Sequence, residues 1–317
     1  MRRIETERPV VSLHWAEGEP VDLIDGAAGR SYRGRFDQVV VSPSGRYSVM
    51  YAERGTAGLL LRDGEPLREL IRAEYSAEDY DYPVAVGVLP DGREVVVHCP
   101  EEYNVLRIDD AETGRPLLSG DRRPMDVFHS RLAISPGGRH LLAAGWYWHP
   151  YGVCMVFDLR QALDDPAVLD DGGVMPIDAV DAEVESACWL DADRLVVATT
   201  LDGPRDRGVE GALGSGHIGV WSIGAGAWTH RATLDRPAGT MLPCGDRVVA
   251  LFGHPRVLDP TTGKALAEWP DVDSGTKSGS YGVTHVPTPI AAVDPDGRRL
   301  AVAQSYGVAV VDLPPAG

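Results

Sequence analysis

One short sequence motif recurs along this chain and limits what it can fold into. A run of alternating apolar residues is followed by a turn rich in Pro, Asp and Gly, then an Arg and a second apolar run. Clear copies occupy residues 39–51, 88–97 and 134–142. Measured at the third residue before each Arg, successive copies are 47, 46, 55, 53 and 51 residues apart. Each copy predicts two antiparallel strands joined by a tight turn, because Gly and Asp supply hairpin-turn geometry.

A second landmark follows each copy: a strand that ends in an acidic or polar residue before another turn. Residues 59–63, 155–158 and 308–312 are examples, and seven such segments occur at a mean spacing near 48 residues. Most units then add a fourth short strand, as in residues 65–71 and 264–269. Four short strands in a unit of this length describe one blade of a β-propeller. The predicted fold class is therefore all-β.

Composition supports many short strands joined by turns. The 317 residues include 36 Gly and 24 Pro, well above ordinary usage, while apolar content is sufficient for a buried core. Disorder, collagen and a helical bundle are thereby excluded. One helical turn is expected at residues 159–163, because Asp158 is a good N-cap.

The two chain ends are expected to share one blade. The C-terminal unit offers three strands before Pro314 and Pro315, and residues 3–7 are expected to supply its missing outer strand. The N-terminal unit offers short strands at residues 10–15, 21–25 and 31–33. We predict a single propeller domain over residues 1–317 with seven blades. The alternative is six blades, with the N-terminal strands absorbed into the closure.

The motif resembles a known family of repeats. The Ser-Pro-Ser-Gly-Arg turn at residues 42–46, followed by a strand pair that ends in Asp, is similar to the WD40-like β-propeller repeats of bacteria. The resemblance covers nearly the whole chain. No copy carries the Trp-Asp dipeptide of eukaryotic WD40 blades, to which Trp221-Ser222 is the nearest approach. The resemblance implies the fold but no activity, since such repeats occur on scaffolds, sensors and enzymes.

The sequence favours a cytoplasmic protein. Charged residues flank Ile4, so the N-terminus has no apolar signal segment. The longest uncharged stretch, residues 141–157, is interrupted by His149-Pro150-Tyr151-Gly152, and it fits two buried strands better than a membrane helix. The cysteines are far apart and are expected to be buried free thiols: Cys99, Cys154, Cys188 and Cys244.

The predicted loops divide the molecule into two unequal faces. The turns between the first and second strands are short and uniform, and they lie on one face. The opposite face receives long loops of variable length, at residues 73–83, 119–128, 146–152, 201–216 and 271–289. Long irregular loops in a compact domain are usually functional. We therefore expect the binding surface on this second face.

Aromatic residues are concentrated in these long loops. Four aromatic side chains lie within residues 146–151, and Tyr75, Tyr80 and Tyr82 alternate with acidic residues. Exposed aromatic residues are common anchors for a protein partner. The alternative is that Trp146 and Trp148 point inward and belong to the core. The predicted contact residues are Tyr80, Tyr82, Tyr147, His149, Tyr151, Lys277, Tyr281 and His285.

Histidines support a second hypothesis, an enzyme with its site at the mouth of the central channel. His149, His254 and His285 are its candidate acid–base or ligand residues, with carboxylates such as Glu183 and Glu185 nearby. The reaction would be that of a hydrolase, lyase or isomerase. Histidines at strand ends are more often hydrogen-bonded structural residues. No established catalytic or metal-binding motif occurs, so no metal or cofactor is assigned.

The favoured function is non-catalytic binding of a protein or peptide on the long-loop face. The formal net charge of −17 favours a basic partner and disfavours nucleic acid and anionic membranes. Binding of a small molecule in the central channel is left open as a further possibility.

Overall fold

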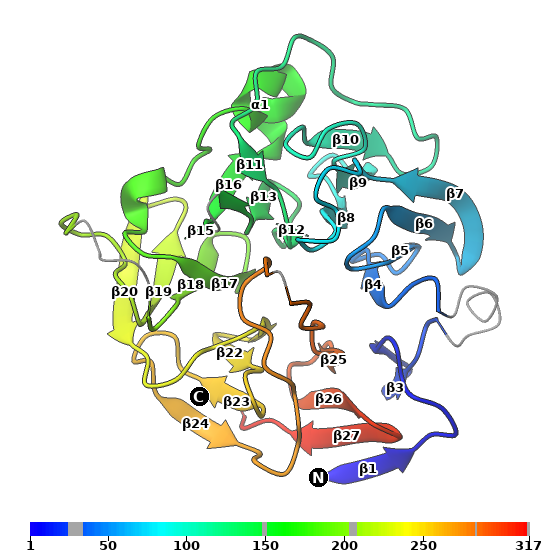
Figure 1. Ribbon diagram of the computed structural model, residues 1–317, viewed down its shortest axis with the longest axis vertical. Coiled ribbons are helices and arrows are strands. Elements are labelled where there is room, and N and C mark those ends of the chain that lie inside the picture. Colours follow the sequence, from blue (N-terminus) through cyan, green and yellow to red (C-terminus); the bar gives the residue numbers. More distant parts are fainter. Residues whose placement is uncertain (25–33, 148–150, 203–207, 283, 316–317) are drawn as a thin grey trace.

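Antiparallel sheets follow one another around a common centre (Figure 1). The computed structural model describes residues 1–24, 34–147, 151–202, 208–282 and 284–315. Within this part of the chain there are six sheets of three or four strands that match the repeat units, plus smaller pieces. In four pairs of neighbouring sheets the first strands contact one another near the centre. This is a β-propeller-like arrangement.

The first three sheets come from residues 38–158. The first has the strand order β4 (Gln38–Val41), β5 (Tyr47–Tyr51), β6 (Ala57–Arg62) and β7 (Glu65–Ile71). The second contains β8 (Val84–Val88), β9 (Glu94–His98) and β10 (Arg107–Asp110). The third contains β12 (Leu132–Ile134), β13 (His140–Ala143) and β16 (Met155–Asp158).

The next two sheets each have four consecutive strands. The fourth sheet consists of β17 (Val184–Trp189), β18 (Arg194–Thr199), β19 (His217–Ser222) and β20 (Ala227–Thr233). The fifth consists of β21 (Met241–Cys244), β22 (Arg247–Ala250), β23 (Arg256–Leu258) and β24 (Ala265–Glu268). All pairings are antiparallel, as the hairpin motif requires.

The sixth sheet combines both ends of the chain. Its strands are β25 (Ala291–Val293), β26 (Arg299–Gln304), β27 (Gly307–Asp312) and, outermost, β1 (Arg2–Glu5). Arg2 pairs with Val310 and Glu5 with Gly307. Next along the chain, β2 (His14–Ala16) and β3 (Glu19–Val21) form a two-stranded hairpin beside β25.

The recurring motif forms the turn between the first two strands of a sheet. Gly45 in the first sheet and Gly92 in the second each donate a backbone N–H to the carbonyl three residues earlier, at 2.9 Å. Their φ angles are +73° and +87°, in the region that Gly adopts without a Cβ penalty. The predicted hairpins are confirmed at these positions.

Several smaller elements lie before, between or after the strands of the third sheet in sequence. The strands β11 (Val127–Phe128), β14 (Trp146–Tyr147) and β15 (Tyr151–Gly152) form a separate three-stranded sheet. The helix α1 (Leu159–Asp164) begins directly after β16, and the Asp158 carboxylate accepts hydrogen bonds from the N–H groups of Arg160 and Gln161. This confirms the predicted helical turn. Two 3₁₀ helices follow, η2 (Pro166–Leu169) and η3 (Ile177–Ala179).

The core lies between successive sheets, because side chains alternate between the two faces of each strand. On β13, Leu141 packs toward the second sheet while Leu142 packs toward the fourth. All four cysteines are buried free thiols, as predicted. Across the described residues, no helix has the length and apolarity needed to cross a membrane.

Candidate functional site

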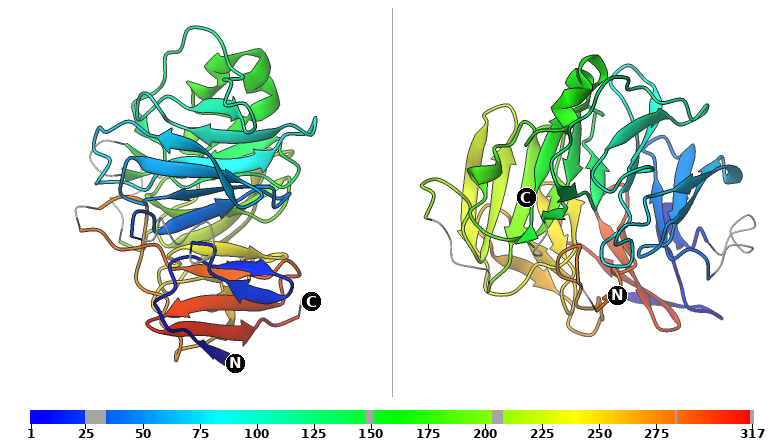
Figure 2. Two further views of the ribbon diagram at one scale, coloured as in Figure 1. Left: turned by 90° about the vertical axis from the view of Figure 1, so that its right-hand side faces the viewer. Right: turned by 45° about the horizontal axis from the view of Figure 1, so that its top comes forward.

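Three features occupy the face that carries the long loops, here called the long-loop face. They are a segment that crosses the centre, a row of aromatic side chains and an apolar pocket. In the left panel of Figure 2 this face is on the left, where the orange segment before β25 projects from the sheets. The repeat-motif turns lie on the opposite side.

The segment between β24 and β25, residues 269–290, passes over the middle of the ring and is here called the strap (Figure 1). Its described residues include Lys277, which is only 3% exposed. The Lys277 ammonium lies 2.7 Å from Asp81 Oδ1 and 3.3 Å from Glu53 Oε1. Arg54 Nε lies 3.3 Å from the same Asp81 oxygen. Two cations thus neutralise two buried carboxylates under the strap.

Burial dominates the electrostatics of this cluster. Loss of hydration raises the pKa of Asp81, although Lys277 and Arg54 lower it in part. The Glu53 carboxylate also accepts a 3.2 Å hydrogen bond from the Thr288 N–H and a short one from the Thr288 hydroxyl. These contacts fix the strap to the loop between β5 and β6.

The strap is also bound to more distant sheets. The Ser278 hydroxyl donates to Glu185 Oε1 on β17 at 3.0 Å. The Gly253 N–H, just after β22, donates to the Gly275 carbonyl at 2.6 Å. The strap therefore connects the first, fourth and fifth sheets across the centre of this face.

An aromatic row extends outward from the strap. Tyr281 on the strap lies 4.2 Å from Trp146, centroid to centroid, and Trp146 stacks on Phe128 at 4.1 Å. Phe128 stacks on Tyr103 at 4.3 Å, and Tyr75 lies 5.1 Å from Tyr103. Phe128 and Trp146 are buried, Tyr103 and Tyr281 are half-buried, and Tyr75 is 56% exposed. The row is thus anchored in the core at its middle and is open to solvent at its ends.

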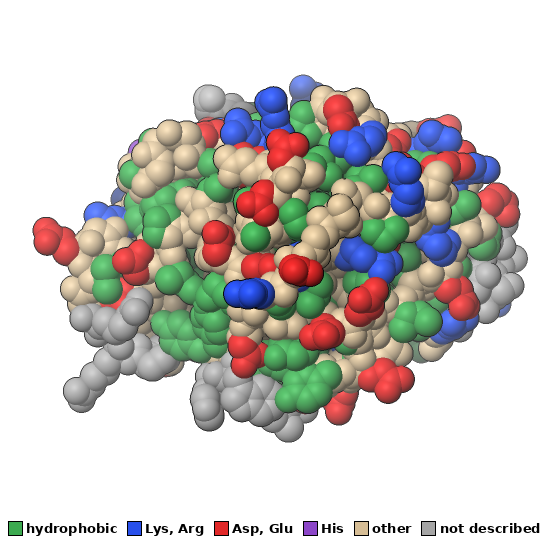
Figure 3. Space-filling view, turned by 90° about the horizontal axis from the view of Figure 1, so that it is seen from above, with side chains coloured by type: hydrophobic (Ala, Val, Ile, Leu, Met, Phe, Trp, Pro, Cys, Tyr) green, Lys and Arg blue, Asp and Glu red, His purple; other side chains and the backbone are tan. Residues whose placement is uncertain are grey.

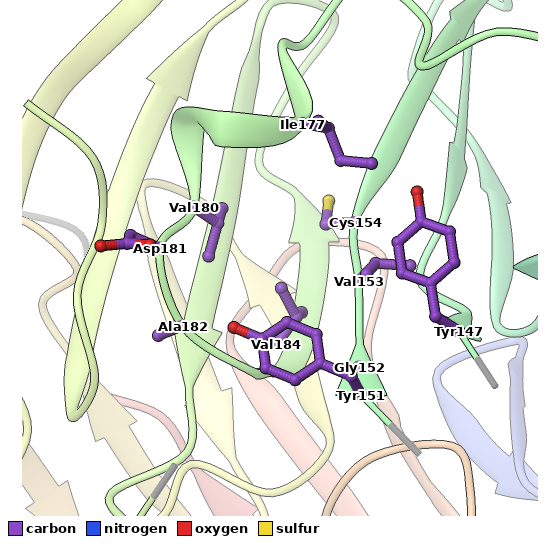
Figure 4. Close-up of a pocket in the computed structure, with 10 residues that line it drawn as sticks. All are labelled: Tyr147, Tyr151, Gly152, Val153, Cys154, Ile177, Val180, Asp181, Ala182 and Val184. Atoms are coloured by element: carbon purple, nitrogen blue, oxygen red, sulfur yellow. The ribbon is translucent and has the colours of Figure 1, made fainter. Parts of the chain in front are cut away.

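An apolar pocket of about 340 Å³ opens beside the row, between the third and fourth sheets (Figure 4). Tyr147 and Tyr151 stand on one side of it, and Ile177, Val180 and Asp181 stand across from them. The remaining lining residues are small or aliphatic: Gly152, Val153, Cys154, Ala182 and Val184. Burial raises the pKa of the Cys154 thiol to about 12, so it lines the pocket as a neutral group. The pocket suits an apolar ligand group.

The structure places the predicted contact residues in three different environments. Tyr147 and Tyr151 line the pocket, and Tyr281 is part of the aromatic row. Tyr80 and Tyr82 differ from the expectation, because both rings are buried against the Arg72 guanidinium, at 4.3 and 5.3 Å.

Lys277 also differs from the expectation of an exposed contact, because its two carboxylate partners hold it under the strap. His285 is partly exposed, with Nε2 3.7 Å from Glu53 Oε2. His149 lies outside the described residues. The alternative orientation of Trp146, pointing inward, is the one observed.

The candidate catalytic histidines that can be described have separate partners. His254 Nε2 lies 3.0 Å from Glu268 Oε2 on the outer strand β24, and this hydrogen bond lowers the pKa of Glu268. His285 instead faces Glu53 near the centre. Among the described residues, no group of three His, Cys, Asp or Glu side chains is placed to hold a metal ion.

Sequence reasoning missed several residues of this face. Tyr103 follows two glutamates and Phe128 belongs to a short apolar segment, so neither residue stands in an aromatic cluster of the sequence. Ile177 and Val180 lie in an acidic segment that has no regular strand pattern. The apolar residues that recur among its carboxylates over 177–184 were the available signal.

The fold and this face define a β-propeller-like protein. No protein-family model matches the chain, and no curated protein matches it. Among solved structures, it is similar to a chain in the crystal structure of the Mitotic Checkpoint Complex, with a TM-score of 0.63 and 13% identity over 99% of this chain and 95% of that one. It is also similar to the hydrazine synthase of Kuenenia stuttgartiensis, with a TM-score of 0.54 and 14% identity over 88% and 83% of the two chains. At these identities the likeness supports the fold alone.

Proposed function

We propose that this protein is a non-catalytic scaffold that binds a protein or peptide on its long-loop face. The observation that carries the proposal is the aromatic row, which ends in the exposed ring of Tyr75 and the half-buried rings of Tyr103 and Tyr281. Aromatic side chains held rigidly by buried neighbours are effective anchors, because little side-chain entropy is lost on binding. One solved structure with a similar fold is a protein assembly, the Mitotic Checkpoint Complex, which agrees with this role.

The strap supports a surface site over a site inside the channel. Its contacts with Glu53, Asp81 and Glu185 cover the centre of the face that carries the aromatic row. A partner that approaches this face would meet the strap, the row and the pocket together. The enzyme hypothesis would place its chemistry at this same covered centre.

We further infer that residues 1–317 form one domain with seven units around the centre. The β2–β3 hairpin, which lies next to β25, would be the seventh unit and the smallest one. The pairing of β1 with β27 supports closure of the ring by the N-terminal strand.

The test is a selection of random peptides on the purified protein, followed by affinity measurements on variants. Tyr75→Ala should weaken binding by about 1–3 kcal/mol without lowering the melting temperature. Tyr103→Ala should weaken binding similarly and also lower the melting temperature, because Tyr103 stacks on the buried Phe128. Asp91→Ala and Asp296→Ala, both exposed on the turn face, are the controls and should bind as the wild type does.

Loss of binding in the turn-face variants alone would show that the wrong face was chosen. Turnover of a small-molecule substrate that disappears in His254→Ala or His285→Ala, while the variants remain folded, would favour the enzyme hypothesis instead.

A further inference from the structure

One wall of the apolar pocket mixes apolar and acidic side chains. Over residues 177–184 the sequence reads Ile-Asp-Ala-Val-Asp-Ala-Glu-Val. The cavity is lined by Ile177, Val180, Ala182 and Val184, and by Asp181, whose carboxylate accepts hydrogen bonds from the Gly208 and Val209 N–H groups. Ile177 is 42% exposed and stands at the edge of the cavity. A large exposed aliphatic side chain at the edge of an apolar cavity is suited to contact with a partner.

The carboxylates of this wall give it a negative character. Asp178 is exposed next to Ile177, and Glu183 is half-buried between two lining residues. Burial raises the pKa of Glu183, the Gly152 N–H, 3.4 Å from Oε1, lowers it in part, and the carboxylate of Glu185 raises it again. A cation from a partner would favour the ionised form of Glu183. Neither Asp178 nor Glu183 has an ion-pair partner within the described part of the chain.

The opposite wall adds no cation, although the buried guanidinium of Arg131 lies close enough to lower the pKa of the Cys154 thiol in part. None of the described residues that line the pocket is Lys or Arg. Figure 3 shows the molecule from above, with the long-loop face along its lower margin, where acidic and hydrophobic side chains predominate. A cation brought by a partner would therefore meet favourable potential at this wall.

The size of the pocket limits what can enter it. About 340 Å³ lies at the lower end of the range for small-ligand pockets. This volume accepts one bulky side chain, with Tyr147 and Tyr151 on one side and the aliphatic wall on the other.

We propose that this pocket receives one bulky aliphatic or aromatic side chain from the partner peptide, and that a Lys or Arg within one to three residues of it contacts Asp178 and Glu183. The inference rests on the proposed peptide-binding function and adds the chemical class of the peptide. It assigns Ile177 to apolar contact and Asp178 to charge recognition.

The experiment is selection from a random heptapeptide library displayed on phage, followed by titration of the best synthetic peptide with purified variants. Ile177→Asp tests apolar contact, and Leu266→Asp, at a similarly exposed leucine on the outer strand β24, is its matched control. Asp178→Lys tests charge recognition, with Asp296→Lys on the turn face as its control. Both test positions are exposed, so the variants should fold.

The expected result is enrichment of peptides that combine a bulky apolar residue with a nearby Lys or Arg. Affinity should fall at least 10-fold in Ile177→Asp and about 3- to 10-fold in Asp178→Lys, and the controls should be unchanged. Replacement of the bulky peptide residue by Ala, or of the basic residue by Glu, should reproduce these losses.

Other outcomes separate the pocket assignment from the proposal that the protein binds a peptide. Peptides that bind equally to wild type and Ile177→Asp, but lose affinity in Tyr75→Ala, would overturn the pocket assignment and leave peptide binding intact. Binding of an apolar dye that Ile177→Asp abolishes, with no peptide selected, would overturn both and indicate a small-molecule site. Selected peptides without a basic residue would overturn the charge assignment.

Discussion

Lys277 offers the sharpest test of the strap, because its ammonium contacts two buried carboxylates. The chain contains only one other lysine, Lys264, which serves as the control. Replacement of Lys277 by Met keeps most of the side-chain volume and removes the ammonium that lies between Glu53 and Asp81. Removing one partner from a buried ion pair typically costs about 3–5 kcal/mol, because the remaining charge is buried without compensation. Since Arg54 still contacts Asp81, we expect the free energy of unfolding to fall by about 3 kcal/mol at pH 7.5, the lower end of this range.

The assay is urea denaturation at pH 7.5 and at pH 5. A carboxyl group whose pKa is raised by folding, as that of Asp81 is, binds more protons in the native state than in the unfolded state. The destabilisation caused by burying the ionised carboxylate is therefore largest at high pH, and it is relieved as the pH falls through the raised pKa. Without Lys277 the pKa of Asp81 should rise further, so the deficit of Lys277→Met should be smaller at pH 5 than at pH 7.5.

The matched control is Lys264→Met, at an exposed position, which should change the free energy of unfolding by less than about 0.5 kcal/mol. A deficit below about 1 kcal/mol for Lys277→Met at pH 7.5 would refute the argument that the ion pairs hold the strap. A deficit that grows at pH 5 would refute the assignment of the penalty to ionised carboxylates.

Two further predictions concern packing. Deletion of residues 1–7 removes β1 and leaves β27 as an open edge, so the melting temperature should fall by several degrees in differential scanning calorimetry; an unchanged temperature would mean that β1 adds no stability. Gly152→Ala would bring a Cβ within 2.2 Å of the Val184 carbonyl oxygen, so it should cost about 1–3 kcal/mol and distort the pocket. Its crystal structure should show β15 displaced from β17, and an unmoved β15 with full stability would contradict this reasoning.

The fold was predictable because its determinants are local. The turn at residues 42–46 and its copies at Gly92, Gly138 and Gly297 close with the same short-range hydrogen bond, and Asp158 caps its helix within three residues. The repeat spacing therefore located the hairpins, and the capping residue Asp158 located the helical turn.

The site was less predictable because its contacts are distant in sequence. Lys277 meets Asp81 across 196 residues and Glu53 across 224, and nothing near Lys277 indicates that it is buried. Tyr80 and Tyr82 are polar enough for an exposed loop, and although Arg72 directly after β7 is near them in sequence, no local pattern shows that its guanidinium packs against their rings. The sequence places aromatic residues on the long-loop face, but it does not show which of them the fold covers.

The pairing of β1 with β27 sets an order in time for assembly of the sixth sheet. Arg2 leaves the ribosome more than 300 residues before Val310, its partner. At about 5–20 residues per second, β1 waits roughly 15–60 s without a strand to pair with. Three of its four residues are charged, and the strand is short, which are features that discourage an unpaired strand from joining another chain. The composition of β1 therefore suits a strand that is made first and used last.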